Sequence, residues 1–396
     1  MTIHLDKMNI LFVVYGFYLK GNGLSASARR TVQKLKEAGE NVRVLSAPNT
    51  DPDGPQPDYP LKEKHYPIID GLVTSSGYTF ATRPLKVIRE ALRWADVVHI
   101  EEPFNLQRRT VLVAKAMGVP CVATYHLHPE NLLSAVRMGR WRLLNDIILW
   151  FWRFTVFDFC KDIQCPTKNV SDRLARNGFR SRLHLISNGL IIDGDSPEKD
   201  HGADSDEVFN VICVGRLAVE KGQDTLLRAM RCSRYADRIQ LTFAGQGPQA
   251  DSYKRKAEDL YKSGVLRHEP KFVFLDQNGI RELARKADLY IHCATIEVEG
   301  LSCLEVLREG VVPVIADGPL SATAQFALDD RSVFPVRDYK SLAMKIDRWL
   351  DDKEERHKCE KLYASSVYRY DISRSIDDIR QMYKDAIASM PGRSAS

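Results

Sequence analysis

Residues 209–222 read FNVICVGRLAVEKG, a mostly apolar run that ends in a glycine and a basic loop. The apolar run predicts a strand of a parallel sheet, because strands covered on both faces carry nearly continuous hydrophobic residues. Gly215 lets the chain turn after the strand, and Arg216 and Lys221 lie on the loop that leads to the next helix. Two cations beside a helix N-terminus favour a diphosphate site. The alternative is a surface loop whose cations are solvated.

The same alternation of short apolar runs and helical patterns extends in both directions from this stretch. Helical patterns such as 26–38 and 85–94 lie between the runs, which predicts parallel sheets covered by helices. Two such sets in one chain predict an α/β protein with two doubly wound, Rossmann-like domains. The runs with strand character are 9–15, 41–47, 96–102, 120–126, 162–167 and 183–187 in the first half, and 209–215, 239–245, 271–276, 288–294 and 311–316 in the second.

The join between the two domains is rich in Gly, Asp and Ser, which is typical of a linker. We expect a first domain at 1–188, a linker at 189–206, a second domain at 207–371, a helix at 372–388 and a disordered tail at 389–396. A return of that helix to the first domain is one option. Asp193 and Asp195 in the linker are interpreted as solvated turn residues rather than metal ligands.

The composition is that of a soluble globular protein with an excess of basic residues. The 396 residues carry a net charge of +5, and no apolar run reaches the roughly 18 residues of a membrane span. The N-terminus lacks the pattern of a signal peptide. The eight scattered cysteines fit a reduced protein. These features together favour a cytoplasmic location.

A second candidate site stretch, EVEGLSCLE at 297–305, follows the apolar run 288–294. Ser302 and Glu305 fit a capping box at the start of a helix, which is the structural interpretation of Glu305. Glu297 has no such explanation. The backbone N–H groups of Gly300, Leu301 and Ser302 would point out of the helix start toward an anion.

The order of these motifs resembles the family-four retaining glycosyltransferases of the GT-B fold. The resemblance rests on Arg-x4-Lys-Gly followed by Glu-x7-Glu, and it extends over nearly the whole chain through ISNGLIID, FAGQGP and REGVVPVIAD. It implies that Arg216 and Lys221 hold the diphosphate of a nucleotide-sugar, Glu305 the nucleotide ribose and Glu297 the hydroxyls of the transferred sugar. Glu299 departs from the family, which usually has an aromatic residue there, and adds a negative charge near the donor.

The stretch TYHLHPEN at 124–131 follows a strand of the first domain. His126 and His128 would share one face of an extended chain, and with Glu130 they could bind a metal. The resemblance instead matches His126 to a histidine near the donor sugar, and we expect no metal. A structural histidine is the alternative. At the end of another strand, Glu101 or Glu102 could face the acceptor, with surface charge as the alternative.

GNGLSA at 21–26 and GQGPQA at 245–250 both match the dinucleotide fingerprint Gly-x-Gly-x-x-Ala. An insertion separates Gly21 from the first strand, and the second match follows the wrong strand, so we expect no NAD or other cofactor. The resemblance implies that Gly21 and Gly23 lie in a loop facing the donor phosphates. A plain turn is the alternative.

The stretch 138–157 mixes Arg140, Arg142 and Arg153 with Trp141, Trp150 and Trp152. Arg and Trp on an amphipathic helix suit a membrane interface, although core packing is the commoner use of such residues. Residues 130–184 hold ten basic against five acidic residues, an excess of 10 − 5 = +5. An anionic membrane surface on the inner face of the cell membrane is the expected partner.

The resemblance thus implies a metal-independent, retaining hexosyltransferase that uses a nucleotide-sugar, most often UDP-linked in that family. Its acceptor would be a hydroxyl of a membrane lipid or a cell-envelope glycan. A sugar-nucleotide epimerase of related fold is an alternative enzyme. A non-enzymatic basic scaffold is a third interpretation, but no aromatic platform or known module supports nucleic-acid binding.

Overall fold

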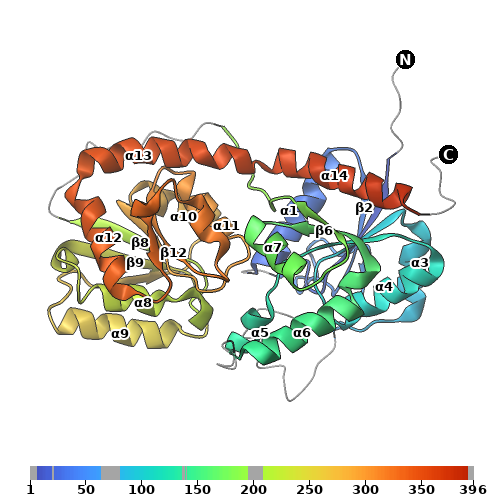
Figure 1. Cartoon of the computed structure of the whole chain (residues 1–396), viewed down its shortest axis with the longest axis horizontal. Helices are drawn as coiled ribbons and strands as arrows, with labels where there is room; N and C mark the ends of the chain where they lie inside the picture. The colour runs from blue at the N-terminus through green and yellow to red at the C-terminus, as the bar shows by residue number, and fades with distance from the viewer. Residues whose placement is uncertain are drawn as a thin grey trace. The chain divides into compact units, whose positions relative to one another are not determined.

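A computed structural model of the chain describes residues 7–19, 22–63, 81–135, 139, 141–194 and 208–390. The chain divides into two compact units (Figure 1). The first unit consists of Met1–Gly189 and Ile372–Ser396, and the second unit consists of Leu190–Asp371. Each unit has its own parallel sheet with helices around it. The expected fold class, α/β with two doubly wound domains, is therefore confirmed.

The sheet of the first unit has the strand order β3-β2-β1-β4-β5-β6-β7, and every neighbouring pair is parallel. Its elements are β1 (Asn9–Val13), α1 (Gly23–Glu37), β2 (Asn41–Ser46), β3 (Tyr59–Pro60), α3 (Leu85–Trp94), β4 (Val97–Ile100), α4 (Asn105–Met117), β5 (Cys121–Thr124), α5 (Pro129–Ala135), α6 (Arg142–Thr155), β6 (Cys160–Cys165), α7 (Lys168–Arg176), β7 (Arg182–Leu185) and α14 (Ile372–Ala388).

The sheet of the second unit has the order β10-β9-β8-β11-β12-β13, again with all pairs parallel. Its elements are β8 (Phe209–Val214), α8 (Gln223–Ala229), β9 (Ile239–Ala244), α9 (Ala250–Lys262), β10 (Lys271–Val273), α10 (Gln277–Arg285), β11 (Leu289–His292), α11 (Leu301–Leu307), β12 (Val312–Asp317), β13 (Val333–Pro335), α12 (Tyr339–Asp351) and α13 (Lys353–Ser366), with short 3₁₀ turns between them.

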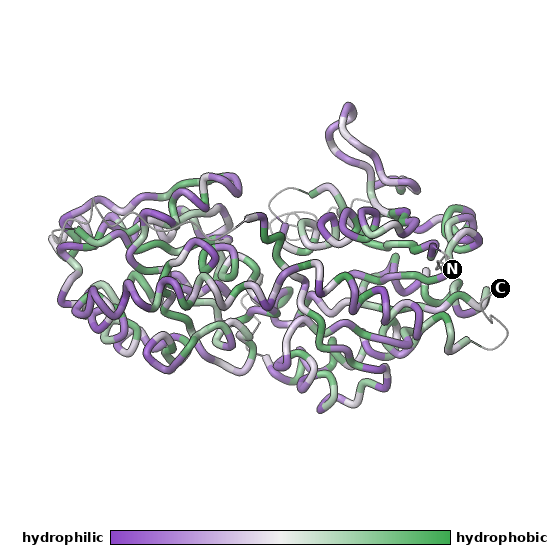
Figure 2. Tube along the Cα trace, turned by 90° about the horizontal axis from the view of Figure 1, so that it is seen from above, coloured by the Kyte–Doolittle hydropathy of each residue, from purple (hydrophilic) through white to green (hydrophobic). Residues whose placement is uncertain are grey.

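The central strands are buried on both faces, as the apolar runs predict. Ile10, Leu11, Phe12 and Val13 of β1 are all fully buried. Successive residues of a strand point to opposite faces, so both faces of the sheet are covered. Figure 2 shows hydrophobic segments running through the interior of each unit between hydrophilic ones. Among the described strands, the sequence missed β3 and β13, which have two and three residues.

Helix α14 belongs to the first unit, although its sequence follows the second (Figure 1). It contacts α1. Arg380 on α14 forms an ion pair of 2.8 Å with Glu40, and Glu40 also accepts the backbone N–H of Met8 at 2.8 Å. The helix has the bounds 372–388 that the sequence predicts. The tail residues 391–396 and the linker residues 195–207 lie outside the described residues.

The strand orders define where a ligand can bind in each unit. In an open parallel sheet, ligands bind beyond the carboxyl ends of the strands, at the point where the strand order reverses. That point lies between β8 and β11 in the second unit, and between β1 and β4 in the first. The loops after these four strands carry most of the residues that the sequence singles out.

Candidate active site

In the second unit, the loop after β8 carries two basic side chains. Arg216 forms an ion pair with Glu220, and the side-chain amide of Gln223 donates to the carbonyl of Arg216 at 2.8 Å. Lys221 forms an ion pair with Glu297, which lies after β11. Neither cation is simply solvated, so the surface-loop interpretation is wrong. Both are held by carboxylates at the point where the strand order reverses.

The backbone of this loop packs tightly against the loop after β9. A Cβ atom on Gly245 would lie only 2.1 Å from the carbonyl oxygen of Gly215, and φ of Gly245 is +154°. Glycine is required there because any side chain would collide with that carbonyl. The second Gly-x-Gly stretch therefore serves a close approach of two backbones rather than a dinucleotide.

Glu297 is held in place by backbone hydrogen bonds on both sides. Its N–H donates to the carbonyl of Leu320 at 2.8 Å, and its carbonyl accepts from Ala322 at 3.0 Å. Burial tends to raise the pKa of Glu297, but the Lys221 ammonium and His292 hold that pKa below its ordinary value. The carboxylate is therefore ionised at neutral pH.

His292 is a member of this cluster that the sequence reasoning missed. Its Nε2 lies 3.8 Å from Glu297 Oε2, and its Nδ1 lies 2.7 Å from the hydroxyl of Tyr290. Burial lowers the pKa of His292 to about 4, so the ring is neutral at pH 7. The sequence did offer one signal for this contact: Tyr290 and His292 are two residues apart on a strand, so their side chains share a face.

Helix α11 does not begin as the capping-box interpretation requires. Its N-cap is Gly300, with φ of +87°, and it begins at Leu301. A Cβ on Gly300 would lie 2.2 Å from Thr323 Cγ2. Ser302 is the second residue of the helix, and a capping box needs it at the N-cap. The capping-box interpretation of Glu305 is therefore wrong. The first N–H groups, at Leu301 and Ser302, have no acceptor within the helix.

Two further acidic residues of this stretch, Glu305 and Glu299, are at least partly buried. Glu305 lies on the second turn of α11 and is partly buried. Glu299, where the resembled family usually has an aromatic residue, is only 2% exposed. Its charge contributes to the raised pKa of Tyr370, which is caused mainly by burial. The departure at Glu299 is therefore an interior feature of the loop.

In the first unit, His126 lies just after β5 and pairs with Glu101, which lies just after β4. His126 Nε2 is 2.7 Å from Glu101 Oε2. Glu101 and Glu102 are each 2% exposed, so the surface-charge interpretation of these residues is wrong. Burial tends to raise the pKa of Glu101, but His126 and His99 hold it below its ordinary value.

The expected common face of His126 and His128 is not present. β5 ends at Thr124, so both residues lie on the following loop and have different partners. His128 Nδ1 is 3.0 Å from the guanidinium of Arg173, and the same guanidinium binds Glu130 at 2.8 and 3.0 Å. Glu130 is therefore unavailable for a metal. Among the described residues, no group of three or more His, Cys, Asp or Glu side chains could hold a metal ion.

The glycine loop before α1 is only partly described. Gly21 lies outside the described residues. Gly23 is exposed and is the first residue of α1, after the N-cap Asn22, whose side chain accepts from the N–H of Ser25. β1 ends at Val13, well before this helix. The long connection differs from the tight turn of a dinucleotide site.

Helix α6 exposes an apolar stripe. Its exposed apolar residues recur at helical spacing and lie on one face, namely Leu143, Ile147, Trp150, Phe151 and Phe154. Trp150 is 58% exposed, but Trp152 is 4% exposed and contacts Phe104. The expectation that Trp152 joins a membrane-facing group is therefore wrong, while Trp141 and Trp150 are exposed. No helix of the described chain is both long and apolar enough to span a bilayer.

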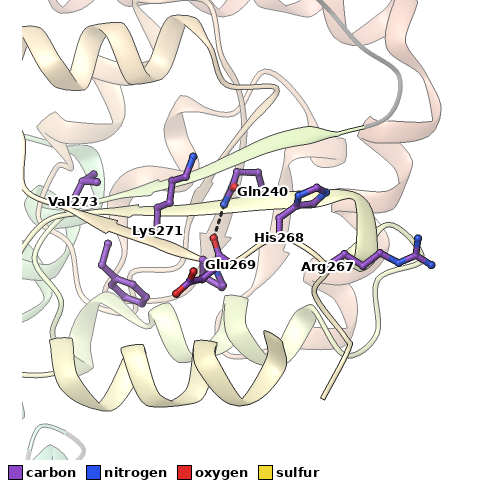
Figure 3. Close-up of a pocket in the computed structure, with 8 residues that line it drawn as sticks. Gln240, Arg267, His268, Glu269, Lys271 and Val273 are labelled. Carbon is purple, nitrogen blue, oxygen red and sulfur yellow. Dashed lines mark hydrogen bonds between the residues drawn. The ribbon is translucent and has the colours of Figure 1, made fainter. Parts of the chain in front are cut away.

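A shallow surface pocket of about 460 Å³ lies apart from all of these residues (Figure 3). It runs along the outer edge strand β10, where the side chain of Gln240 donates to the carbonyl of Glu269 at 2.9 Å. Several lining residues, including Arg267 and His268, precede β10. The pocket thus begins at the amino end of the strand, opposite to where ligands of such sheets bind.

Family models match both halves of the chain. The model for glycosyl transferases group 1 matches residues 196–363, and the model for glycosyltransferase family 4 matches residues 21–193. Among curated proteins, the α-monoglucosyldiacylglycerol synthase of Streptococcus pneumoniae is 21% identical over 94% of this chain and 85% of its own length. The GDP-mannose:cellobiosyl-diphosphopolyprenol α-mannosyltransferase of Xanthomonas oryzae is 23% identical over 96% of this chain and 97% of its own.

Solved structures share the fold of the whole chain. Sucrose-phosphate synthase from Thermosynechococcus elongatus superposes with a TM-score of 0.72 at 16% identity, over 97% of this chain and 100% of that one. HepE from Anabaena, in complex with UDP and glucose, superposes with a TM-score of 0.69 at 14% identity, over 96% and 100%.

Proposed function

The chain belongs to the family-four glycosyltransferases with the GT-B fold, and on that premise we propose that it transfers a hexose from a UDP-sugar to a hydroxyl group. The proposed acceptor is a membrane lipid or a cell-envelope glycan. Transfer would retain the anomeric configuration and would need no metal ion. The observation that carries the donor side is the pairing of Arg216 and Lys221 with carboxylates at the strand-order reversal of the second unit.

The two cations are suited to stabilise a leaving diphosphate. Charge develops on that group as the glycosidic bond breaks, and preorganised cations stabilise it most in the transition state. In the structure, Lys221 is paired with Glu297. A phosphate would replace that partner and leave the ionised Glu297 to accept hydrogen bonds from the sugar hydroxyls. Two side-chain cations then supply the positive charge that a metal ion supplies in other enzymes.

Glu305 would bind the ribose of the nucleotide. It lies on α11, immediately after the loop that holds Glu297, so one short segment would contact both the sugar and the nucleoside. Neutral His292, whose Nε2 lies 3.8 Å from Glu297, would add no competing positive charge beside the sugar at pH 7. Gly21 and Gly23 remain proposed as phosphate-facing loop residues, on the resemblance alone.

The acceptor side points to a membrane. The curated relatives include a diacylglycerol glucosyltransferase and a diphosphopolyprenol mannosyltransferase, both of which act on lipid-linked acceptors by name. The exposed apolar stripe of α6 is the feature of this chain that fits such acceptors, because an exposed apolar face on a soluble protein marks an interaction surface. Trp150 and Phe154 lie on it, with ring centroids 4.7 Å apart.

The excess of basic residues in 130–184 favours an anionic membrane as the surface that the stripe of α6 contacts. Among the described residues of 130–184, four ion pairs join basic to acidic residues, namely Arg153–Asp158, Lys168–Asp172, Arg173–Glu130 and Arg182–Asp162. The excess of basic residues therefore rests on the others, among them exposed Arg142 at the start of α6. We place the enzyme in the cytoplasm, peripherally attached to the inner face of the cell membrane.

The test is a product assay with the full chain. UDP-glucose, UDP-galactose and GDP-mannose are offered with diacylglycerol in anionic vesicles, with and without EDTA, and the anomeric configuration of the product is read by NMR. We expect an α-linked glycolipid from a UDP-sugar, undiminished by EDTA. A β-linked product, transfer only from GDP-mannose, or loss of transfer with EDTA would each refute that part of the proposal. Isomerised free nucleotide-sugar without transfer would favour an epimerase.

A further inference from the structure

A chain of buried polar side chains connects the last helix of the protein to Glu101 in the first unit. The hydroxyl of Tyr383, on α14, lies 2.6 Å from His99 Nδ1. His99 Nε2, on β4, lies 2.7 Å from Thr124 Oγ1 and 3.2 Å from Glu101 Oε1. These side chains are all at least 97% buried. The proposed reaction assigns no role to Tyr383 or His99.

The directions of the hydrogen bonds among these side chains can be assigned by starting from Gln164. Gln164 donates its amide N–H groups to the carbonyls of Ile186 and Ser187, at 3.2 and 3.3 Å, so its Oε1 is the acceptor. Thr124 donates its hydroxyl to that oxygen at 2.8 Å. Because the only hydrogen of the Thr124 hydroxyl is used there, His99 Nε2 must be a donor.

The remaining nitrogen of His99 then has a defined role. Burial lowers the pKa of His99 to about 4, so the ring carries a single proton at neutral pH. With that proton on Nε2, Nδ1 is an acceptor, and the Tyr383 hydroxyl donates to it. The ring is also stacked on Phe12, with centroids 4.5 Å apart and planes at 21°. His99 is therefore fixed in both orientation and tautomer.

Glu101 lies between the imidazole rings of His99 and His126. Its Oε1 lies 3.2 Å from His99 Nε2 and its Oε2 lies 2.7 Å from His126 Nε2. We propose that Glu101 is a positioning residue for His126, and that Tyr383 on the last helix sets Glu101 through His99. This inference rests on the proposed function in one respect, namely that His126 touches the substrate. The imidazole would then present Nδ1 to that substrate while Nε2–H is held by Glu101.

The neighbouring Glu102 shows that burial alone does not explain this arrangement. Glu102 is equally buried, but it accepts the N–H of Tyr15 at 3.0 Å and the amide of Gln107 at 2.5 Å. Burial raises the pKa of Glu102 well above its ordinary value. Keeping Glu101 ionised inside the protein is costly unless its charge is paired. Apolar residues in place of a buried ion pair often stabilise a protein equally well. The pairing with two imidazoles indicates a role beyond packing.

The first test is a double-mutant cycle on the rate of sugar transfer. Gln keeps the shape of Glu101 but loses its charge and one acceptor oxygen, so Glu101→Gln should lower kcat by roughly 10- to 100-fold through misplacement of His126, with little change in the donor KM. In a His126→Ala background, Glu101→Gln should cause no further loss. Equal fractional losses in both backgrounds would overturn the proposal.

Tyr383→Phe extends the cycle to the last helix. It should lower kcat by a smaller factor in the wild-type background and by none in the Glu101→Gln background. One control has matched chemistry: Tyr363→Phe removes a buried hydroxyl that accepts from Leu328 N–H in the second unit. It should keep wild-type kcat. A loss with Tyr383→Phe that persists in full without Glu101 would exclude the proposed link.

The second test does not depend on activity, so it separates this inference from the proposed function. NMR of protein labelled with ¹⁵N-histidine reports which ring nitrogen carries the proton. We expect His99 as the Nε2–H tautomer, and we expect His126 to lose its fixed Nε2–H tautomer in Glu101→Gln. His99 protonated on Nδ1 would overturn the proposal that Tyr383 acts on Glu101 through His99. If the spectra show these tautomers but the wild type transfers no sugar from any donor, the proposed positioning of His126 stands and the proposed function fails.

Discussion

Lys221 and Glu297 form an ion pair although 76 residues separate them in the sequence. They meet because β8 and β11 are parallel neighbours, so the loops that follow these strands lie at the same edge of the sheet. The pair links the proposed phosphate contact to the proposed sugar contact. Replacing either residue should therefore affect catalysis more than stability.

Lys221→Ala and Arg216→Ala should each slow transfer strongly in a folded protein. Losing one cation that stabilises the leaving diphosphate should raise the barrier by about 2–4 kcal/mol. Steady-state kinetics with the thermal midpoint measured in parallel checks this. Lys256→Ala is the matched control, because Lys256 forms an exposed ion pair with Asp224 in the same unit. Wild-type turnover in folded Lys221→Ala would refute the assignment.

Glu305→Gln should weaken nucleotide binding while leaving the thermal midpoint nearly unchanged. A carboxylate can accept both ribose hydroxyls, whereas an amide retains one acceptor and loses the charge. Isothermal titration with UDP measures the effect, and Glu258→Gln, at an exposed ion pair with Lys262, is the control. The same affinity in Glu305→Gln as in the wild type would remove Glu305 from the binding site.

The free energy of unfolding should fall as the pH is lowered from about 6.5 toward 4. Burial lowers the pKa of His292 and of His99 to about 4, so in this window the unfolded chain binds protons that the folded chain does not. Each histidine should contribute on the order of 3 kcal/mol to the loss. Glu101 and Glu297, whose folded pKa values are lowered despite burial, add to it at lower pH.

Urea unfolding at pH 7 and pH 5 measures this slope. His292→Gln should make the free energy of unfolding less dependent on pH, because Gln cannot take up the proton. Lys256→Ala, which changes no histidine, should keep the wild-type slope. An unchanged slope in His292→Gln would show that this ring is not kept neutral by burial.

The wild-type chain should co-sediment with anionic vesicles through α6. Each basic residue near such a surface contributes about 1 kcal/mol, and salt should weaken that part because the Debye length falls from about 10 Å at 0.1 M to about 3 Å at 1 M. Trp150→Ala with Phe154→Ala should remove the salt-resistant part. Leu362→Ala is the control, because Leu362 is a comparably exposed residue of α13. Equal binding to neutral vesicles, or none at low salt, would contradict the membrane proposal.

The sequence by itself determined the kind and order of most elements and the residues of the basic loop after β8. The apolar runs predicted β1 and β8, and the helical pattern predicted the last helix at 372–388, because strand and helix periodicities are local properties of the chain. Arg216, Lys221 and Glu297 could be found because each lies within a few residues of a recognisable strand end.

Tertiary structure alone decided which groups meet and which faces are buried. His99, Glu101 and His126 come together only because β4 and β5 pair in a particular register, and Tyr383 joins them from a helix 284 residues away from His99 in sequence. Trp150 and Trp152 look alike in sequence, but the packing of α6 exposes one and buries the other. The start of α11 depends on the backbone conformation of Gly300, where Thr323 leaves no space for a Cβ atom. These features depend on packing between residues that are far apart in the sequence, so no local sequence pattern predicts them.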